Sequence, residues 1–462
     1  MQSTDKKVAI IGAGITGLTA AFELQSRGID FTIFEASDRS GGVIRTVKED
    51  GFLVECGPNS ILDTHPNLGK LISRLGLDDE KLGSNPAAEN RFIVRDGKPV
   101  ALPTSPPALL KSKAFSTKAK LRLLKEPFIK SKSNPSESLA DFVVRRLGQE
   151  FLDYAINPFV SGVYAGDPAK LATCLAFPKL YELEQQYGSL IKGAIKGAKE
   201  RKKRADTASK DARMFSFKDG MEVLPKTLAD KLDGSIRFEH PIAGISHLES
   251  GRWNVGNEGF TDVVIALPAH VMTQLETPFD LNPFSEIYYP AVTSISLGFN
   301  VNQIAHALNG FGVLIPKIEN YFSLGALFPS SIFSGRAPDG MALLTLFIGG
   351  SQSADRALMD KDKMLQNVLG DLNELLGIDG KPEFQHMSVW PKAIPQYEIG
   401  YEKHLNHMKK IEADFSGIHF AGHYRDGISV ANSILSGIDV ADRISGTSEK
   451  QDLNGQNDLE AE

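Results

Sequence analysis

The chain has 462 residues, of which 42% are hydrophobic and 23% are charged, and its net charge is −6. At roughly 150 residues per domain this length predicts two or three domains, and the composition excludes wholesale disorder and a fibrous repeat. The 51 basic and 57 acidic residues speak against a dedicated nucleic-acid-binding protein. Cys56 and Cys174 are the two cysteines, which excludes a disulfide framework and a four-cysteine metal or iron–sulfur site. No metal site is predicted.

The start of the chain indicates where the protein works. Its first residues are polar and run into a strand-like segment, without the apolar region and cleavage site of a secretory signal. This start and the low cysteine content predict a reducing, cytoplasmic setting. The longest uncharged stretch, residues 287–316, contains Pro290, Gly298 and several amides, so it predicts buried strands and turns rather than a membrane span.

The first fifty residues predict a strand, a helix and a second strand. Residues 8–11 form a short apolar run, residues 18–25 carry apolar side chains at helical spacing, and residues 31–34 form a second run. Such a βαβ unit places its two strands side by side and parallel.

A glycine-rich turn joins this first strand to the helix. It consists of Gly12, Ala13, Gly14, Ile15, Thr16 and Gly17, which satisfy the pattern G-x-G-x-x-G. The glycines allow a tight turn and bring the backbone close to a pyrophosphate at the positive helix N-terminus. Glu35 and Ala36 follow the second strand, where a carboxylate can bind both ribose hydroxyls. These features predict dinucleotide binding, and the acid disfavours the 2′-phosphate of NADP.

The rest of the chain predicts mixed structure. We expect helices over 66–75, 361–376 and 430–444, a hairpin over 91–102, and a basic helical region over 106–204. Strands are expected over 236–267, 292–349 and 418–422. Residues 201–212 predict an exposed loop, and residues 446–462 a disordered tail.

Residues 39–46, RSGGVIRT, resemble the paired-glycine signature that follows the βαβ unit in flavoproteins of the amine oxidase superfamily. Gly41 and Gly42 would let the loop pass close to the cofactor, and Arg39 and Arg45 can reach phosphate oxygens. The alternative is a basic surface loop. Val43 stands where many amine oxidases have arginine, which weakens an amine-oxidising interpretation.

Two further glycine turns predict flavin contacts. One consists of Gly57, Pro58, Asn59 and Ser60, which either line the flavin ring or form an ordinary turn. The other joins a strand ending at Gly422 to a helix that begins near Ile428, Ser429 and Val430. A helix N-terminus there would stabilise the anionic reduced flavin. Dinucleotide-type elements at both ends of the chain imply that the substrate region is inserted into the cofactor domain.

Residues 157–168, NPFVSGVYAGDP, are similar to the signature segment of the protoporphyrinogen oxidases, the FAD enzymes of late haem and chlorophyll synthesis. Residues 90–97, 310–316 and 390–397 and the C-terminal glycine turn match in the family's order. The resemblance covers nearly the whole chain up to about residue 444.

The resemblance implies an α/β fold with a Rossmann-like FAD-binding domain of the p-hydroxybenzoate hydroxylase type. An α+β substrate domain and a helical, membrane-facing subdomain would be inserted into it. The expected boundaries are 1–90, 213–275 and 385–445 for the FAD domain, 91–105 and 276–384 for the substrate domain, and 106–212 for the helical subdomain.

The resemblance also implies roles for single residues. Arg91 would pair with a propionate of the tetrapyrrole, although an exposed arginine is more often a surface ion pair. Leu314, Leu327 and Phe347 would hold the pyrrole rings, with plain core packing as the alternative. Phe159 and Gly162 would border the pocket above the flavin, where the glycine leaves room for a wide macrocycle. Ile242 and Trp390 would contact the flavin.

The implied activity is oxidation of protoporphyrinogen IX to protoporphyrin IX. Hydride passes to flavin N5 and O₂ reoxidises the flavin to give peroxide, in three cycles that need no acid or base at the hydride step, so no catalytic residue is predicted. A coproporphyrinogen III oxidase remains the nearest alternative, and its substrate's four propionates would need more cations. An amine oxidase or a non-catalytic flavin- or porphyrin-binding protein is less favoured.

The basic segment 109–132 raises the question of a membrane. Its eight lysine and arginine residues alternate with leucine, phenylalanine and isoleucine and are opposed by one acid, Glu126. Such a segment can lie on an anionic bilayer, at the inner face of the cytoplasmic membrane, or it can be a solvated helical face. A homodimer and hand-over of the product to ferrochelatase stay open.

Overall fold

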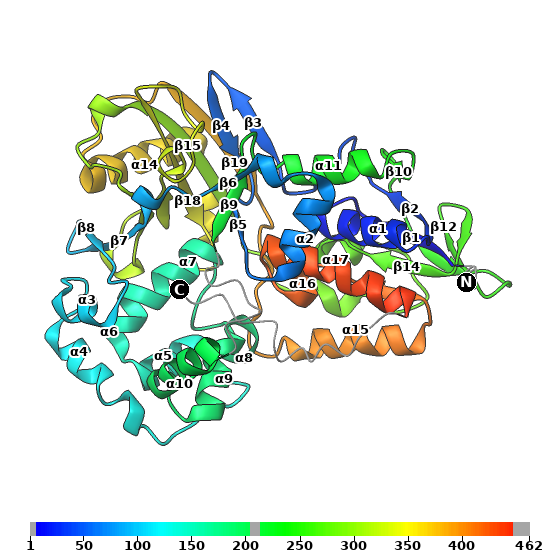
Figure 1. The fold of residues 1–462 in the computed structure, drawn as a ribbon, viewed down its shortest axis with the longest axis horizontal. Coiled ribbons are helices and arrows are strands. Elements are labelled where there is room, and N and C mark those ends of the chain that lie inside the picture. Colours follow the sequence, from blue (N-terminus) through cyan, green and yellow to red (C-terminus); the bar gives the residue numbers. More distant parts are fainter. Residues whose placement is uncertain (1–5, 204–212, 447–462) are drawn as a thin grey trace.

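The computed structural model describes residues 6–203 and 213–446. The molecule is elongated, with a parallel sheet and its helices at one end and a mixed sheet and a helical region at the other (Figure 1). The predicted tail, beyond Gly446, and residues 204–212 of the predicted loop lie outside the described residues.

A five-stranded parallel sheet forms the centre of the first part. Its order is β10-β2-β1-β14-β20, so strands from the start, middle and end of the chain lie side by side. The bounds are β1 Lys7–Ile11, β2 Asp30–Phe34, β10 Ile236–Arg237, β14 Asp262–Ile265 and β20 Ile418–Phe420. The predicted βαβ unit is confirmed, and the sheet combines strands from separated segments of the chain.

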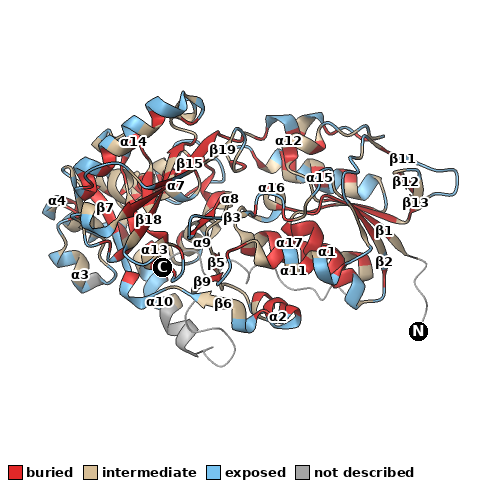
Figure 2. Ribbon diagram, turned by 90° about the horizontal axis from the view of Figure 1, so that it is seen from above, coloured by how far each residue is buried: buried red, intermediate tan, exposed pale blue. Residues whose placement is uncertain are grey.

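Both faces of this sheet are buried, which suits its apolar strands. Val8 and Ile10 face a core formed with helices, and Ala9 and Ile11 face a second core (Figure 2). The helices on the first face are α1 Ile15–Ser26, α2 Pro66–Leu75, α11 Val223–Lys231 and α17 Val430–Ser445. The second face is covered by α12 Ala269–Met272, α15 Glu402–Asp414 and the antiparallel strands β11 Ile245–His247, β12 Trp253–Val255 and β13 Glu258–Phe260.

A seven-stranded mixed sheet organises the second part, in the order β19-β15-β18-β17-β16-β7-β8. Its strands are β7 Asn90–Arg95, β8 Lys98–Ala101, β15 Val292–Asn300, β16 Gly310–Leu314, β17 Gly325–Leu327, β18 Met341–Gly349 and β19 Phe384–Trp390. Helix α14, Lys361–Leu376, packs on one face. The predicted boundary at 385 differs from the structure, because β19 pairs along its whole length with β15.

Two small sheets connect the parts. The hairpin of β3 Thr46–Glu49 and β4 Phe52–Glu55 leads into residues 57–60, the predicted flavin contact, which we call the flavin loop. The second sheet has the order β5-β9-β6, with β5 Ile61–Leu62, β6 Lys81–Gly83 and β9 Met214–Phe217. These strands hold the cofactor end of the molecule against the mixed sheet.

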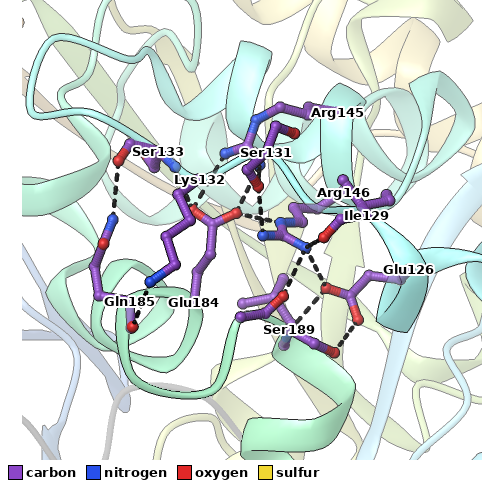
Figure 3. Close-up of polar contacts among 12 residues, drawn as sticks. Glu126, Ile129, Ser131, Lys132, Ser133, Arg145, Arg146, Glu184, Gln185 and Ser189 are labelled. Atoms are coloured by element: carbon purple, nitrogen blue, oxygen red, sulfur yellow. Dashed lines mark hydrogen bonds and ion pairs between the residues drawn. The ribbon is translucent and has the colours of Figure 1, made fainter.

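The helical region is built around buried ion pairs. Arg146, Glu126 and Glu184 have fully buried side chains, and Arg146 forms an ion pair with each of the two glutamates (Figure 3). The helices are α3 Pro106–Lys111, α4 Thr117–Leu123, η3 Glu126–Phe128, α5 Leu139–Arg146, α6 Gln149–Phe151, the π-helix η4 Leu152–Ile156, α7 Asn157–Val163, α8 Thr173–Ala176, α9 Pro178–Tyr187 and α10 Leu190–Lys203. Within the described residues, no helix has the length and apolarity that crossing a membrane requires.

Most predicted elements agree with the structure. Helices α2, α14 and α17 and the β7–β8 hairpin are confirmed, and Asp96 and Gly97 take positive φ at its turn. The loop predicted from residue 201 is wrong for 201–203, because α10 continues to Lys203. The remaining short elements are η1 Asp78–Glu80, η2 Pro86–Ala88, η5 Asn282–Glu286, η6 Val301–Gln303, η7 Lys317–Glu319, α13 Pro329–Ile332, η8 Ala354–Leu358 and α16 His423–Asp426.

Candidate active site

The glycine turn after β1 has the geometry of a dinucleotide cradle. Gly12 has φ +105°, and a Cβ on Gly17 would lie 2.0 Å from the Gly12 carbonyl oxygen, so neither position accepts a side chain. Gly14, which caps α1, has no heavy atom within 4 Å of the place where a Cβ would stand. The backbone therefore leaves space for a phosphate at the start of α1.

Glu35 lies beside this turn. One of its carboxylate oxygens accepts a hydrogen bond from the Ala13 amide at 2.8 Å, and the other accepts from Ser37. Ala36, the next residue after Glu35, is exposed. The backbone carbonyl of Glu35 accepts a hydrogen bond from the amide of His240, which lies two residues before Ile242 in the chain. Glu35, Ala36 and Ile242 are thus brought to one edge of the sheet, where the adenosine end of a dinucleotide would lie.

The paired-glycine loop closes over the turn. The Gly41 amide donates to the Ala13 carbonyl at 2.8 Å, and a Cβ on Gly42 would stand 3.5 Å from Gly14. Arg45 is exposed at the end of the loop. The Arg39 guanidinium donates to carbonyls of its own loop and lies 3.8 Å from a Glu222 oxygen.

The flavin loop is held against the mixed sheet. A Cβ on Gly57 would lie 2.1 Å from the Val43 carbonyl oxygen, so Gly57, Pro58, Asn59 and Ser60 pass directly over the paired-glycine loop. The Trp390 indole donates to the Cys56 carbonyl at 2.9 Å, which ties β19 to the same loop. Trp390 therefore lies beside the loop that contains Gly57.

A second helix begins at the same edge of the parallel sheet. Gly422 has φ +133° just after β20, and Ser429, which follows Ile428, caps α17 at its first residue, Val430. A Cβ on Gly437 would lie 2.6 Å from the Thr16 carbonyl, so α17 packs closely on α1. The positive N-termini of α1 and α17 and the open glycine turn after β1 together suit a dinucleotide cofactor whose flavin ring lies toward β19. The residues present therefore fit FAD.

The predicted substrate residues share one face of the mixed sheet. The pairing registers place Gly325 between Leu314 and Phe347, and Leu327 opposite Thr345. Directly paired residues point to the same side of a sheet. All three predicted apolar residues are half-buried, whereas their neighbours Val313, Ala326 and Leu346 are buried in the core on the α14 side. This face looks away from α14.

Helix α7 packs against that face. A Cβ on Gly162 would lie 2.6 Å from the Leu314 side chain, so the glycine allows α7 to approach the sheet. Phe159 lies on the same helix, with its ring centroid 6.1 Å from that of Tyr164. Arg91 is exposed on β7, in register with Gly312. A π-helical turn, often found at functional sites, precedes α7.

A small cavity lies between the flavin loop and this sheet face. Its lining residues are Leu53, Glu55, Asn59, Ser60, Phe311, Leu327, Pro329, Ile332, Phe333, Arg336, Leu343 and Thr345. Among the described residues that line it, Glu55 and Arg336 carry the charged side chains, and both are buried, at 7% and 2% exposed. The cavity is otherwise apolar with a few neutral polar groups, as is typical of ligand pockets.

The sequence-based prediction missed Glu55 and Arg336. Burial raises the pKa of Glu55 to about 7, although hydrogen bonds from Thr46 and Met221 and the charge of Arg336 oppose this. The Arg336 guanidinium donates to Ser216 Oγ and to the carbonyls of Phe217 and Lys218. The available signal for Glu55 is an acid that ends an apolar strand directly before the flavin loop.

Comparison with known proteins agrees with this site. The family described as flavin containing amine oxidoreductase matches residues 15–445. Protoporphyrinogen oxidase 2 of Arabidopsis thaliana is 36% identical over 95% of this chain and 94% of its own length, and human protoporphyrinogen oxidase is 31% identical over 96% and 99%. Coproporphyrinogen III oxidase of Bacillus subtilis is 27% identical over 95% of this chain and 97% of its own length.

Solved structures show the same fold. A crystal structure from Exiguobacterium sp. 255-15 superposes with a TM-score of 0.81 at 23% identity, covering 96% of this chain and 100% of the other. Reduced UDP-galactopyranose mutase superposes with a TM-score of 0.75 at 15% identity, covering 98% and 99%. The fold and the cradle thus define an FAD-dependent oxidoreductase. The chain belongs to the flavin containing amine oxidoreductase family, in its protoporphyrinogen oxidase branch.

Proposed function

We propose that the protein oxidises protoporphyrinogen IX to protoporphyrin IX, the penultimate step of haem biosynthesis, with O₂ as the electron acceptor. The observation that carries the proposal is the single sheet face shared by Leu314, Leu327 and Phe347, on which Leu327 lines the cavity beside the flavin loop. Apolar walls suit a wide, apolar macrocycle, and Arg91 on the neighbouring strand suits one of its propionates.

The bound FAD would supply a hydride acceptor, used three times for the six electrons that separate porphyrinogen from porphyrin. The chain's own residues supply position and exclude water. The flavin loop is fixed by Trp390 and by the packing of Gly57 on Val43, while α7 covers the sheet face at Leu314. Holding the methylene carbon near the acceptor in a dry cavity contributes most of the rate enhancement.

Anaerobic mixing of the FAD-loaded protein with protoporphyrinogen IX tests the proposal. The flavin absorbance should bleach, and admitting O₂ should restore it with release of hydrogen peroxide. A flavin that stays oxidised while the tetrapyrrole is retained would instead indicate a porphyrin-binding protein. Peroxide release with amines would indicate an amine oxidase.

The cavity favours protoporphyrinogen over coproporphyrinogen III. The four propionates of coproporphyrinogen would need several cations, and among the described residues that line the cavity the cation is Arg336. Both terminal nitrogens of that guanidinium already donate to protein acceptors. Turnover of the two porphyrinogens, measured side by side, should favour protoporphyrinogen. A preference for coproporphyrinogen would reassign the substrate.

We also propose that the protein is cytoplasmic and that segment 109–132 contacts the inner face of the cytoplasmic membrane. Leu110, Leu121, Leu124 and Phe128 expose 58–80% of their side-chain area among the segment's lysines. This combination suits peripheral binding to an anionic bilayer. Sedimentation with anionic vesicles, and not with zwitterionic ones, is the expected result.

A further inference from the structure

We propose that Glu55 accepts the proton that each porphyrinogen oxidation releases inside the cavity and returns it when the cofactor is reoxidised. The inference rests on the proposed function and adds to it an acid–base group. A six-electron oxidation by three hydride transfers also releases three protons, and a largely apolar cavity offers little water to take them up.

Glu55 lies where such a proton acceptor is needed. The cavity that it lines is also bounded by Asn59 and Ser60 of the flavin loop and by Leu327 and Thr345 of the substrate-facing sheet. Alternation along β4 places Leu53 and Glu55 on the same side of the strand, and both line the cavity. Asn59, Ser60 and Thr345 are neutral and cannot take up a proton at physiological pH.

The carboxyl group has neutral hydrogen-bond donors. Its oxygens accept from the Thr46 hydroxyl at 2.7 Å and the Met221 amide at 2.9 Å. The charged groups that face it are Arg336, which favours the carboxylate, and Glu222, which disfavours it, while Asp219 acts on Arg336. Because burial outweighs the favourable contacts, the pKa rises to about 7 and both protonation states are populated at neutral pH.

The proton and electron balance is complete. In each step a C–H bond of a methylene bridge breaks and its electron pair leaves with hydrogen as hydride, so the tetrapyrrole is oxidised and the flavin reduced. In two of the steps a pyrrole N–H bond breaks and its electron pair enters the new C=N bond. In the third, the fourth methylene bridge loses hydrogen as a proton and the electron pair of that C–H bond enters the conjugated ring. Each time the Glu55 carboxylate takes up the proton and becomes a carboxylic acid. When O₂ takes two electrons from the reduced cofactor, hydrogen peroxide formation requires one further proton, which Glu55 supplies.

Anaerobic stopped-flow measurement of flavin reduction across pH tests the role of Glu55. In the wild-type protein the rate should rise as pH increases through about 7 and then level off, because the carboxylate is the accepting form. Glu55→Gln should lower the rate at pH 8 by about 100-fold and abolish the rise. A Glu55→Gln protein that keeps the wild-type rate and pH rise overturns the inference.

Two further variants separate this role from a structural one. Thr46→Val removes a hydrogen bond that lowers the pKa of Glu55, so it should move the midpoint to higher pH, and an unmoved midpoint contradicts the inference. Asp371→Asn is the matched control, because burial raises the pKa of Asp371 too, but it lies on α14 across the sheet from the cavity. The control should keep the wild-type profile.

A measurement without substrate distinguishes failure of the inference from failure of the proposed function. Infrared difference spectra of the FAD-loaded protein should show a carboxylic C=O band that titrates near pH 7 and is lost in Glu55→Gln. Its absence in the wild-type protein overturns the inference alone. A wild-type flavin that porphyrinogen does not reduce overturns the proposed function, whatever the infrared result.

Discussion

Two buried carboxylates, Glu184 in the helical region and Glu55 in the cavity, have pKa values shifted in opposite directions. In the helical region, burial by itself raises the pKa of Glu184, but hydrogen bonds from Arg145, Ser133 and Arg146 outweigh it and the pKa lies below its usual value (Figure 3). In the cavity, burial dominates and the pKa of Glu55 rises to about 7. The number of ionic donors, rather than burial, decides whether a carboxylate stays charged.

The two groups therefore stabilise the fold in opposite pH ranges. The depressed pKa of Glu184 contributes stability above the unfolded pKa of about 4.3, and this is lost as pH falls through the folded pKa. The raised pKa of Glu55 gives a contribution that is present below about pH 4.3 and is lost as pH rises to about 7. The helical region is built to hold its charge, whereas the cavity can gain or lose a proton at neutral pH.

The largest expected effect comes from breaking the helical network. Arg146→Met should lower the free energy of unfolding by about 3–5 kcal/mol, because Glu126 and Glu184 lose a buried cationic partner. Urea denaturation of the FAD-loaded protein at pH 8 measures this loss. Lys403→Met is the matched control, because its pair with Glu286 is exposed and should matter little. Equal losses in the two variants would contradict the comparison.

The pH dependence of stability tests the cavity side. At about 1.4 kcal/mol per pKa unit, Glu55 should make the wild-type protein lose about 3 kcal/mol between pH 4.5 and 7. Glu55→Gln should not show this part of the decline, so the difference in unfolding free energy between the two proteins should change by that amount. If the difference in unfolding free energy between the two proteins stays constant across this pH range, Glu55 titrates alike in the folded and unfolded states.

The parts of the site that depend on local chain geometry could be predicted from the sequence. The turn at Gly12 and Gly17 and the acid at Glu35 follow from spacing within one βαβ unit, because that unit's geometry is set by neighbouring residues. The apolar runs of β15 and β16 likewise indicate strands rather than a membrane span.

The parts of the site that depend on contacts between distant segments could not be predicted from the sequence. The strand pairings between β16, β17 and β18 decide that Leu314, Leu327 and Phe347 share a face, and the resemblance implied this grouping without the register. The pKa of Glu55 depends on Met221 and Arg336, which come from other segments of the chain. The position of β19 beside β15 likewise depends on a long-range pairing.

A smaller effect is expected from Arg91, the exposed arginine on β7. Arg91→Ala should raise KM about tenfold and leave kcat nearly unchanged, because a propionate far from the reacting carbon is held alike in ground and transition states. Lys98→Ala, on the paired strand β8, is the control. Unlike Arg146, Arg91 is exposed, so its replacement should change the unfolding free energy little. An unchanged KM would remove Arg91 from the substrate site.

The smallest expected effect is on the outer surface of the helical region. Among the described large apolar side chains Phe128 is the most exposed, at 80%, and it follows Glu126, which the buried network fixes. Phe128→Ser should weaken binding to anionic vesicles about fivefold, because it removes apolar area from the interface. Phe238→Ser, on the cofactor domain, is the control. Arg146→Met should also weaken vesicle binding, because it disturbs the network that positions Phe128. Intact binding in that variant would show that the network contributes to stability alone.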